Sequence, residues 1–325
     1  MSLIQTNDAV FERGDLIRWT ITLCIAAIDA VWLSASRFSV HGTGSLRLYL
    51  IPIIIWASLA LLASIPRYRE VSSRFFTSRV KISLHCFLLP FVFAKAAAIL
   101  QYLGIALNFP VIDDSLYALD HMLGFEWKTA FLWVRAHTLI SEIFNIAYYS
   151  FWLQLLALPW LLGLSGRFYH LREWLSAMML SCLLVVAIST PFPAHSAFTY
   201  FHAGNAENLD TVSHFQMLRD GTMQTLDIRT LQGLVSMPSF HAVLAVLLSW
   251  ALRFFRPLFV AVSLWNLIML LATPTEGGHY LSDVIAGLMV AIFTLYAVTW
   301  SARRRAKNSP LVPFQRTKTY VFLKH

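Results

Sequence analysis

The chain has 325 residues, of which 58% are hydrophobic and 13% are charged, and its formal net charge is +8. Soluble domains carry roughly 25% charged residues, so this composition excludes an ordinary soluble protein and predicts a membrane protein with several spans. The positive charge lies in short loops and in the tail, which indicates cytoplasmic retention rather than nucleic-acid binding.

Residues 1–15 are polar, and the first apolar run, 16–34, is longer than the core of a signal peptide. We therefore expect a retained helix there, followed by further apolar helices in an all-α transmembrane bundle. The eight expected spans are 16–35, 48–65, 83–105, 143–164, 174–191, 238–252, 257–273 and 280–300.

The orientation follows from lysine and arginine. A cytoplasmic N-terminus leaves 18 of the 25 basic residues on the cytoplasmic side and six outside, with Lys95 inside a helix. Cytoplasmic loops are enriched in these residues, so we expect both termini in the cytoplasm. Segments 106–142 and 192–235 are then external.

The first external segment contains Leu116, Leu119 and Leu123 at helical spacing, followed by Gly124, a typical helix stop. This pattern predicts a short amphipathic helix at the outer membrane interface. The second segment is rich in Pro, Gly, Asn and charged residues, and we expect it to cap a site.

Two polar motifs stand at the start of apolar runs. Ser-Met-Pro-Ser-Phe-His occupies 236–241, and Gly-Gly-His-Tyr-Leu-Ser-Asp occupies 277–283. His279 and Asp283 are four residues apart, so a helix places them on one face. His241 falls in a first helical turn, where free backbone N–H groups favour an anion. Together the motifs predict phosphate-ester chemistry at a membrane surface.

Each residue type suits one role in that chemistry. His279 can act as a nucleophile near neutral pH, Asp283 can orient its ring, and His241 can protonate the leaving oxygen. The Ser239 hydroxyl can hold phosphate oxygens, and a glycine pair allows the backbone to approach the substrate closely. That pair is Gly277 and Gly278.

Two other interpretations stay open. A His–Asp pair at this spacing can be a simple helix contact, and two histidines with an aspartate can bind a metal. Pro-Ser and Gly-Gly have no role in ligation but suit an anion site, so we expect no metal and no cofactor, and activity that chelators leave unchanged.

Pro238-Ser239-Phe240-His241 followed by His279-Tyr280-Leu281-Ser282-Asp283 resembles the type 2 phosphatidic acid phosphatase superfamily. The resemblance covers roughly Pro110 to Trp300, and the motif context is more similar to the branch that contains inositol phosphorylceramide synthases. It implies that His279 forms a phosphohistidine, that Asp283 activates it and that His241 is the acid.

The chain departs from that family in its phosphate-binding residues. The usual Lys-x6-Arg-Pro motif is absent, Thr273 stands where an Arg usually precedes the histidine, and Phe240 replaces a Gly. Because a buried phosphate needs a counter-charge, we expect Arg219 or Arg229 of the external segment to supply it.

The sequence thus predicts an all-helical membrane enzyme that acts on phospholipid phosphate esters at the outer face, in a bacterial inner membrane. Its expected parts are an N-terminal two-helix segment with a basic cytoplasmic loop (1–82), a catalytic bundle (83–300) and a basic cytoplasmic tail (301–325). Water and a lipid alcohol both remain open as acceptors, as do the headgroup and the oligomeric state. The alternative is a non-catalytic scaffold or lipid transporter, which would not need both histidines.

Overall fold

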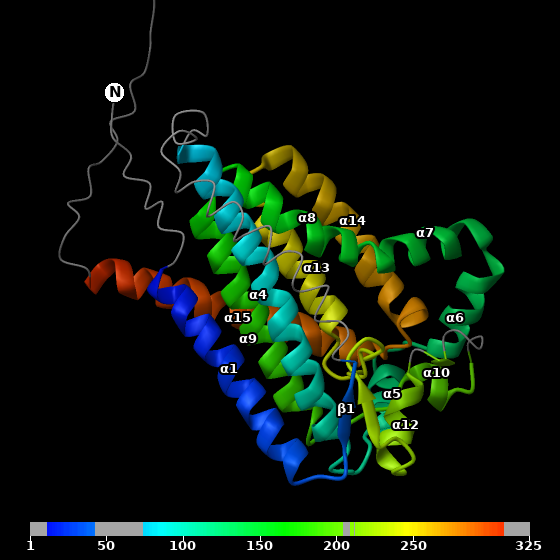
Figure 1. Ribbon diagram of the computed structural model, residues 1–325. Helices are drawn as coiled ribbons and strands as arrows, with labels where there is room; N and C mark the ends of the chain where they lie inside the picture. The colour runs from blue at the N-terminus through cyan, green and yellow to red at the C-terminus, as the bar shows by residue number, and fades with distance from the viewer. Residues whose placement is uncertain (1–11, 43–73, 204–208, 211, 309–325) are drawn as a thin grey trace, which may run out of the picture.

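The computed structural model describes residues 12–42, 74–203, 209–210 and 212–308. This part of the chain is mostly helical with very little strand, which confirms the predicted all-α class (Figure 1). Its elements are α1 (Arg13–Ser34), β1 (Ser39–His41), α4 (Arg74–Ile105), α5 (Asp113–Met122), α6 (Trp127–Ala136), α7 (Thr138–Tyr149), α8 (Phe151–Leu164), α9 (Phe168–Ser189), α10 (Ala197–Tyr200), α12 (Ser213–Arg219), β2 (Thr225–Asp227), α13 (Phe240–Ala251), α14 (Arg256–Glu276) and α15 (Leu281–Asn308).

Within the described residues, five helices are long and apolar enough to cross a membrane, in α1, α4, α9, α14 and α15. The pair α7 and α8, bent by 42° at its junction, makes a sixth if it counts as one span. Helix α13 has only 12 residues, or about 18 Å at 1.5 Å per residue, and is shorter than the hydrocarbon core. The expected span 48–65 lies outside the described residues. The chain is therefore compatible with an integral membrane protein, and the count of eight spans stays a prediction.

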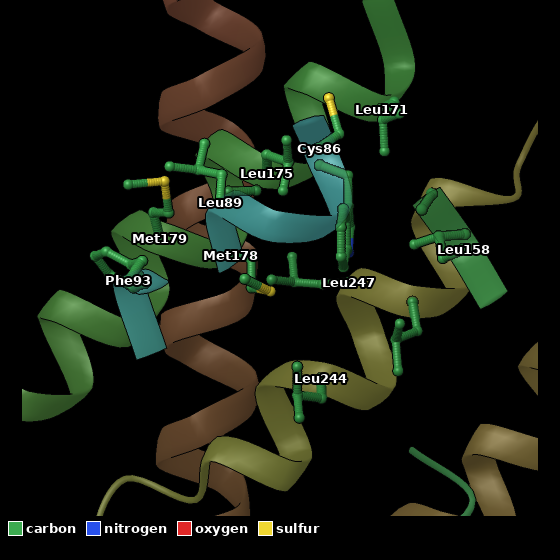
Figure 2. Packing of buried hydrophobic residues seen from close by; sticks show 14 of the residues in the cluster. Cys86, Leu89, Phe93, Leu158, Leu171, Leu175, Met178, Met179, Leu244 and Leu247 are labelled. Carbon is green, nitrogen blue, oxygen red and sulfur yellow. The ribbon is translucent and has the colours of Figure 1, made fainter. Parts of the chain in front are cut away.

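The main core lies between α4, α8, α9, α13 and α15. Figure 2 shows Leu89 and Phe93 of α4, Met178 of α9 and Leu244 of α13 gathered beside α15. These side chains are buried because each of the helices is apolar on most of its surface, so several faces can pack at once. The same helices surround the cavity described below.

Helix α1 is attached to the bundle by buried charges. Asp15 pairs with Arg18 at 2.6 Å and with Arg172 of α9 at 3.1 Å, while Arg172 also reaches Glu12 at 2.7 Å. Breaking such a buried pair leaves an uncompensated charge, which is strongly destabilising. These ion pairs make α1 part of the same packed unit as α9.

The boundaries expected between parts of the chain fall inside helices. The 82/83 boundary lies within α4, which begins at Arg74, and the 300/301 boundary lies within α15, which ends at Asn308. The basic tail therefore begins as a continuation of the last helix.

Short elements gather at one end of the bundle (Figure 1), including α5, α10, α12 and a two-stranded parallel sheet. In that sheet Ser39 pairs with Thr225 and His41 with Asp227, so the chain after α1 is joined to the segment before α13. The predicted short helix at 116–123 is confirmed as α5, and Gly124 follows it with φ +75°. Its position at a membrane interface stays a prediction.

Candidate active site

The turn between α14 and α15 carries His279. Gly278 has φ +63°, a conformation that favours glycine, and a Cβ on Gly277 would lie 2.5 Å from the Tyr148 hydroxyl and 2.9 Å from the His279 ring. Gly277 therefore lets the turn pack tightly against α7, and Gly278 lets it pack against Ser196 and Phe198 at the start of α10. His279 itself is only 5% exposed.

The His279 ring is oriented by two neighbours. Its Nδ1 lies 3.0 Å from the backbone oxygen of Ser236 and 3.4 Å from Oδ2 of Asp283. A carbonyl oxygen can only accept a hydrogen bond, so Nδ1 donates, and the neutral ring keeps its lone pair on Nε2. The predicted His279–Asp283 pair is thus present, but the shorter contact is to Ser236.

Asp283 is fully buried and holds the turn together. Its Oδ2 accepts hydrogen bonds from the Ser236 hydroxyl at 2.8 Å and from the Tyr280 N–H at 3.0 Å. Two donors on one oxygen stabilise the charged carboxylate beside the His279 ring. This arrangement would also stabilise an imidazolium or a phosphorylated ring at His279.

His241 stands in the first turn of α13, with its ring centroid 6.2 Å from that of His279. The Tyr148 ring stacks on it at 4.2 Å, and the Tyr148 hydroxyl lies 3.3 Å from its Nδ1. Its Nε2 is buried and has no hydrogen-bond partner among the described residues. The two histidines are therefore close enough to contact one phosphoryl group.

Ser239 has a structural contact of its own. Its side chain caps α13 by accepting from the Ala242 N–H at 3.4 Å, and its own N–H donates to the backbone oxygen of Asp283 at 3.0 Å. It is fully buried and is not among the residues that line the cavity. In this structure it joins the two histidine-bearing segments, and its predicted contact with phosphate stays a prediction.

Both histidines line a cavity of about 890 Å³. At the end near them it is polar, with Tyr148, Ser236 and Glu276 in its wall. From there an apolar arm extends between α4, α8 and α9. Along α4 its lining runs from Gln101 to Phe87, a length of about 21 Å at 1.5 Å per residue. Its lining includes Phe87, Phe91, Leu155, Trp174, Met178 and Cys182.

The two arginines predicted to bind phosphate lie elsewhere. Arg219 donates to the backbone oxygen of Phe109 at 2.9 Å, and Arg229 pairs with Asp227 at 2.6 Å on the surface. Neither lines the cavity. Lys95 does, and it donates to the backbone oxygen of Ile228 at 2.7 Å.

Helices α5 and α6 fix the His279 turn from outside. Asp120 accepts the N–H groups of Leu281 and Ser282, both at 2.8 Å, and the Trp127 indole donates to the backbone oxygens of His279 at 3.1 Å and Pro274 at 3.0 Å. Burial raises the pKa of Asp120, while those N–H groups oppose the shift.

Asp113, two turns earlier on α5, accepts from the Tyr280 hydroxyl at 3.0 Å and from the His195 N–H. The Asp113 carboxylate raises the pKa of His195, whose ring also lies beside it. The buried face of α5 is therefore acidic, and its two carboxylates hold the start of α15 and the loop before α10.

Several of these residues were not predicted as site residues. Ser236 is the first residue of the 236–241 motif, and its place two residues before Pro238 was the feature of the sequence that could have marked it as a site residue. Tyr148 lies outside both motifs, yet it contacts His241. Glu276 and Asp120 gave no signal, because their partners come from distant parts of the chain.

No cluster of three or more His, Cys, Asp or Glu side chains suited to a metal ion occurs within the described ranges. The prediction that chelators leave activity unchanged awaits measurement.

Comparison with protein families identifies one to which this sequence is similar. The family model described as the PAP2 superfamily matches residues 114–297, more than half of the chain and a range that includes both motifs. No curated protein and no solved structure matches the chain.

Proposed function

Because this chain belongs to the PAP2 superfamily, we propose that it is an integral-membrane phosphatase-type enzyme that acts on phosphate esters of lipids. The observation that carries the proposal is the cavity, in which two histidines stand at the polar end of a long apolar arm. A lipid phosphate ester fits this cavity, because its phosphate can lie at the polar end beside the histidines and its alkyl chain can lie in the apolar arm. Family membership favours this over a scaffold or a transporter.

In the first step, the Nε2 lone pair of His279 attacks phosphorus and forms a P–N bond. The bond from phosphorus to the leaving oxygen breaks, and protonated His241 gives its proton to that oxygen. The contact of Nδ1 with Ser236 supports His279 as the nucleophile, because it leaves Nε2 unprotonated. The carboxylate of Asp283 stabilises the positive charge that develops on the ring.

In the second step, an oxygen nucleophile attacks phosphorus and the P–N bond breaks, which frees His279. His241, now neutral, takes the proton of that nucleophile. With water the reaction is hydrolysis, and with a lipid hydroxyl it is transfer, as the similarity to inositol phosphorylceramide synthases suggests. The apolar arm favours a lipid acceptor, because it can exclude water around an alkyl chain.

We further propose that the site faces the outside of a bacterial inner membrane, with both termini in the cytoplasm and eight spans in total. The distribution of lysine and arginine supports this orientation. Catalysis without a metal belongs to the same proposal, since the two histidines can supply both the nucleophile and the acid.

The test uses purified full-length protein and phosphatidic acid labelled with ³²P in the phosphate group. We expect acid-labile label on the peptide that contains His279, and none in His279→Ala. His241→Ala should form product roughly 10²–10⁴-fold more slowly, because the leaving oxygen then lacks its proton donor.

The matched control is His121→Ala, which removes an exposed histidine paired with Glu126 and should keep the label. Adding ceramide, or a diacylglycerol whose acyl chains differ from those of the substrate, separates transfer from hydrolysis by the product that takes up ³²P. Label on the His241 peptide, or full turnover by His279→Ala, would overturn the mechanism.

A further inference from the structure

Glu276 is a buried carboxylate in the wall of the same cavity. It is the last residue of α14, three positions before His279, and it is only 4% exposed. The cavity lining includes it together with His241 and His279. The mechanism above gives it no role, although burying an ionised group is costly unless it is paired.

One carboxylate oxygen of Glu276 is held in place from α6. Arg135 Nη2 lies 3.1 Å from Oε2 and also donates to the backbone oxygen of Thr275 at 3.3 Å. Its other nitrogen, Nη1, donates to the Ser141 hydroxyl at 2.9 Å, and the guanidinium lies over the Phe131 ring. These contacts fix Arg135, and Arg135 fixes the orientation of the Glu276 side chain.

The second oxygen, Oε1, is buried and has no hydrogen-bond partner among the described residues. A buried acceptor left unpaired is unfavourable, so this atom is suited to a donor brought by a ligand. Phosphate oxygens cannot play that part, because they would meet the carboxylate as like charges. The group that faces Oε1 must therefore carry an O–H or N–H.

We propose that Glu276 binds a hydroxyl or ammonium group on the alcohol esterified to the substrate phosphate, and so selects lipids whose headgroup carries a hydrogen-bond donor. The inference rests on the proposed function and adds the substrate class. A phosphate at the two histidines leaves the headgroup within reach of the polar wall to which Glu276 belongs. Hydroxyl and ammonium donors share the required chemistry, and experiment separates them.

The test measures kcat/KM of the purified protein for lipids that differ only in the headgroup. Phosphatidylethanolamine and phosphatidylcholine form the key pair, because both carry a positive nitrogen but only the former has N–H donors. Phosphatidylglycerol supplies hydroxyl donors, and phosphatidic acid has no headgroup alcohol. We expect the wild type to prefer at least one donor-bearing lipid over phosphatidylcholine.

Glu276→Gln keeps an oxygen for Arg135 but removes the charge. It should lower the ratio of kcat/KM for the donor-bearing lipid to that for phosphatidylcholine by about tenfold to a hundredfold, the loss typical of one hydrogen bond to a charged group. Glu276→Asp retains the charge and should keep part of the preference. Glu126→Gln, at an exposed glutamate paired with His121, is the matched control and should keep the wild-type ratio.

The outcomes separate this inference from the proposed function. Wild-type protein that consumes none of the lipids contradicts the proposed function, and this inference with it. Wild-type protein that turns over lipids without preferring a donor contradicts this inference alone. A Glu276→Gln variant whose activity falls equally for every lipid also contradicts this inference alone, because an equal loss is what a purely structural role of Glu276 would give.

Discussion

Among the residues that the structure describes, Lys95 is the only lysine or arginine in the lining of the cavity. It projects from α4, and its ammonium donates to the backbone oxygen of Ile228 at 2.7 Å. A phosphate in a low-dielectric site needs a nearby cation, and a backbone carbonyl is a weaker partner for an ammonium than a phosphate oxygen is. Arg219 and Arg229 could serve only by moving away from their present partners.

We expect Lys95→Met to lower kcat/KM for phosphatidic acid by roughly tenfold to a hundredfold, mainly through KM, because a charge-assisted contact with the phosphate is lost. Arg219→Ala and Arg229→Ala, measured in parallel, should cost less. Lys128→Met, at an exposed lysine of α6, controls for a general loss of positive charge. A larger loss in either arginine variant would instead support the sequence-based assignment.

Motif spacing predicted only part of this site. The four-residue spacing of His279 and Asp283 predicted that their side chains are close, because residues four apart lie on the same face of a helix. The contacts of Tyr148 with His241 and of Arg135 with Glu276 join residues 93 and 141 positions apart. Such contacts depend on how helices pack, and no local pattern in the sequence encodes that.

At the scale of elements, α5 shows where the periodicity argument succeeds and where it stops. The leucine spacing and Gly124 located the helix. Of the three leucines, however, only Leu116 is buried, and it shares the inner face with Asp113 and Asp120. The leucine spacing did not predict that the inner face of α5 is acidic, and it is acidic because Asp120 binds free N–H groups at the start of α15.

Asp120→Ala should therefore act on the catalytic turn through α15. Removing an acceptor from N–H groups of a first helical turn costs about 0.5–2 kcal/mol, so we expect a lower melting temperature in detergent. We also expect a reduced kcat with little change in KM, because the His279 turn is less well held. Asp120→Asn, which keeps an acceptor oxygen, should recover part of both losses.

The matched control for this element is Asp114→Ala. Asp114 lies on the same helix, is exposed and accepts a hydrogen bond from the Tyr200 hydroxyl. Equal losses of kcat in the two variants would argue against a specific action of Asp120 on the turn.

At the scale of the whole molecule, the histidines and a group of basic residues lie at opposite ends of the bundle. The α14–α15 turn and the start of α13 lie at the end of the bundle that carries α5, α10 and α12 (Figure 1). Three basic residues stand at the opposite helix ends: Arg167 before α9, Arg253 between α13 and α14, and Arg256 as the first residue of α14. The positions of the basic residues and of the two motifs relative to the apolar helices could be predicted from composition and hydropathy. The bend between α7 and α8 and the short α13 could not, because they depend on packing.

We predict that the end with the histidines faces outward and that the end of α15 faces the cytoplasm. Single cysteines at Lys128, in the external segment, and at Arg303, near the end of α15, report the two sides; both positions are exposed. The background must first replace Cys24, Cys86 and Cys182, and it must retain activity. In intact spheroplasts, a membrane-impermeant maleimide should label Lys128→Cys at once and Arg303→Cys only after permeabilisation. The reverse pattern would show that the orientation is the opposite of the one proposed. The proposed active site would then face the cytoplasm, because both labelled positions belong to the same helical bundle as the histidines.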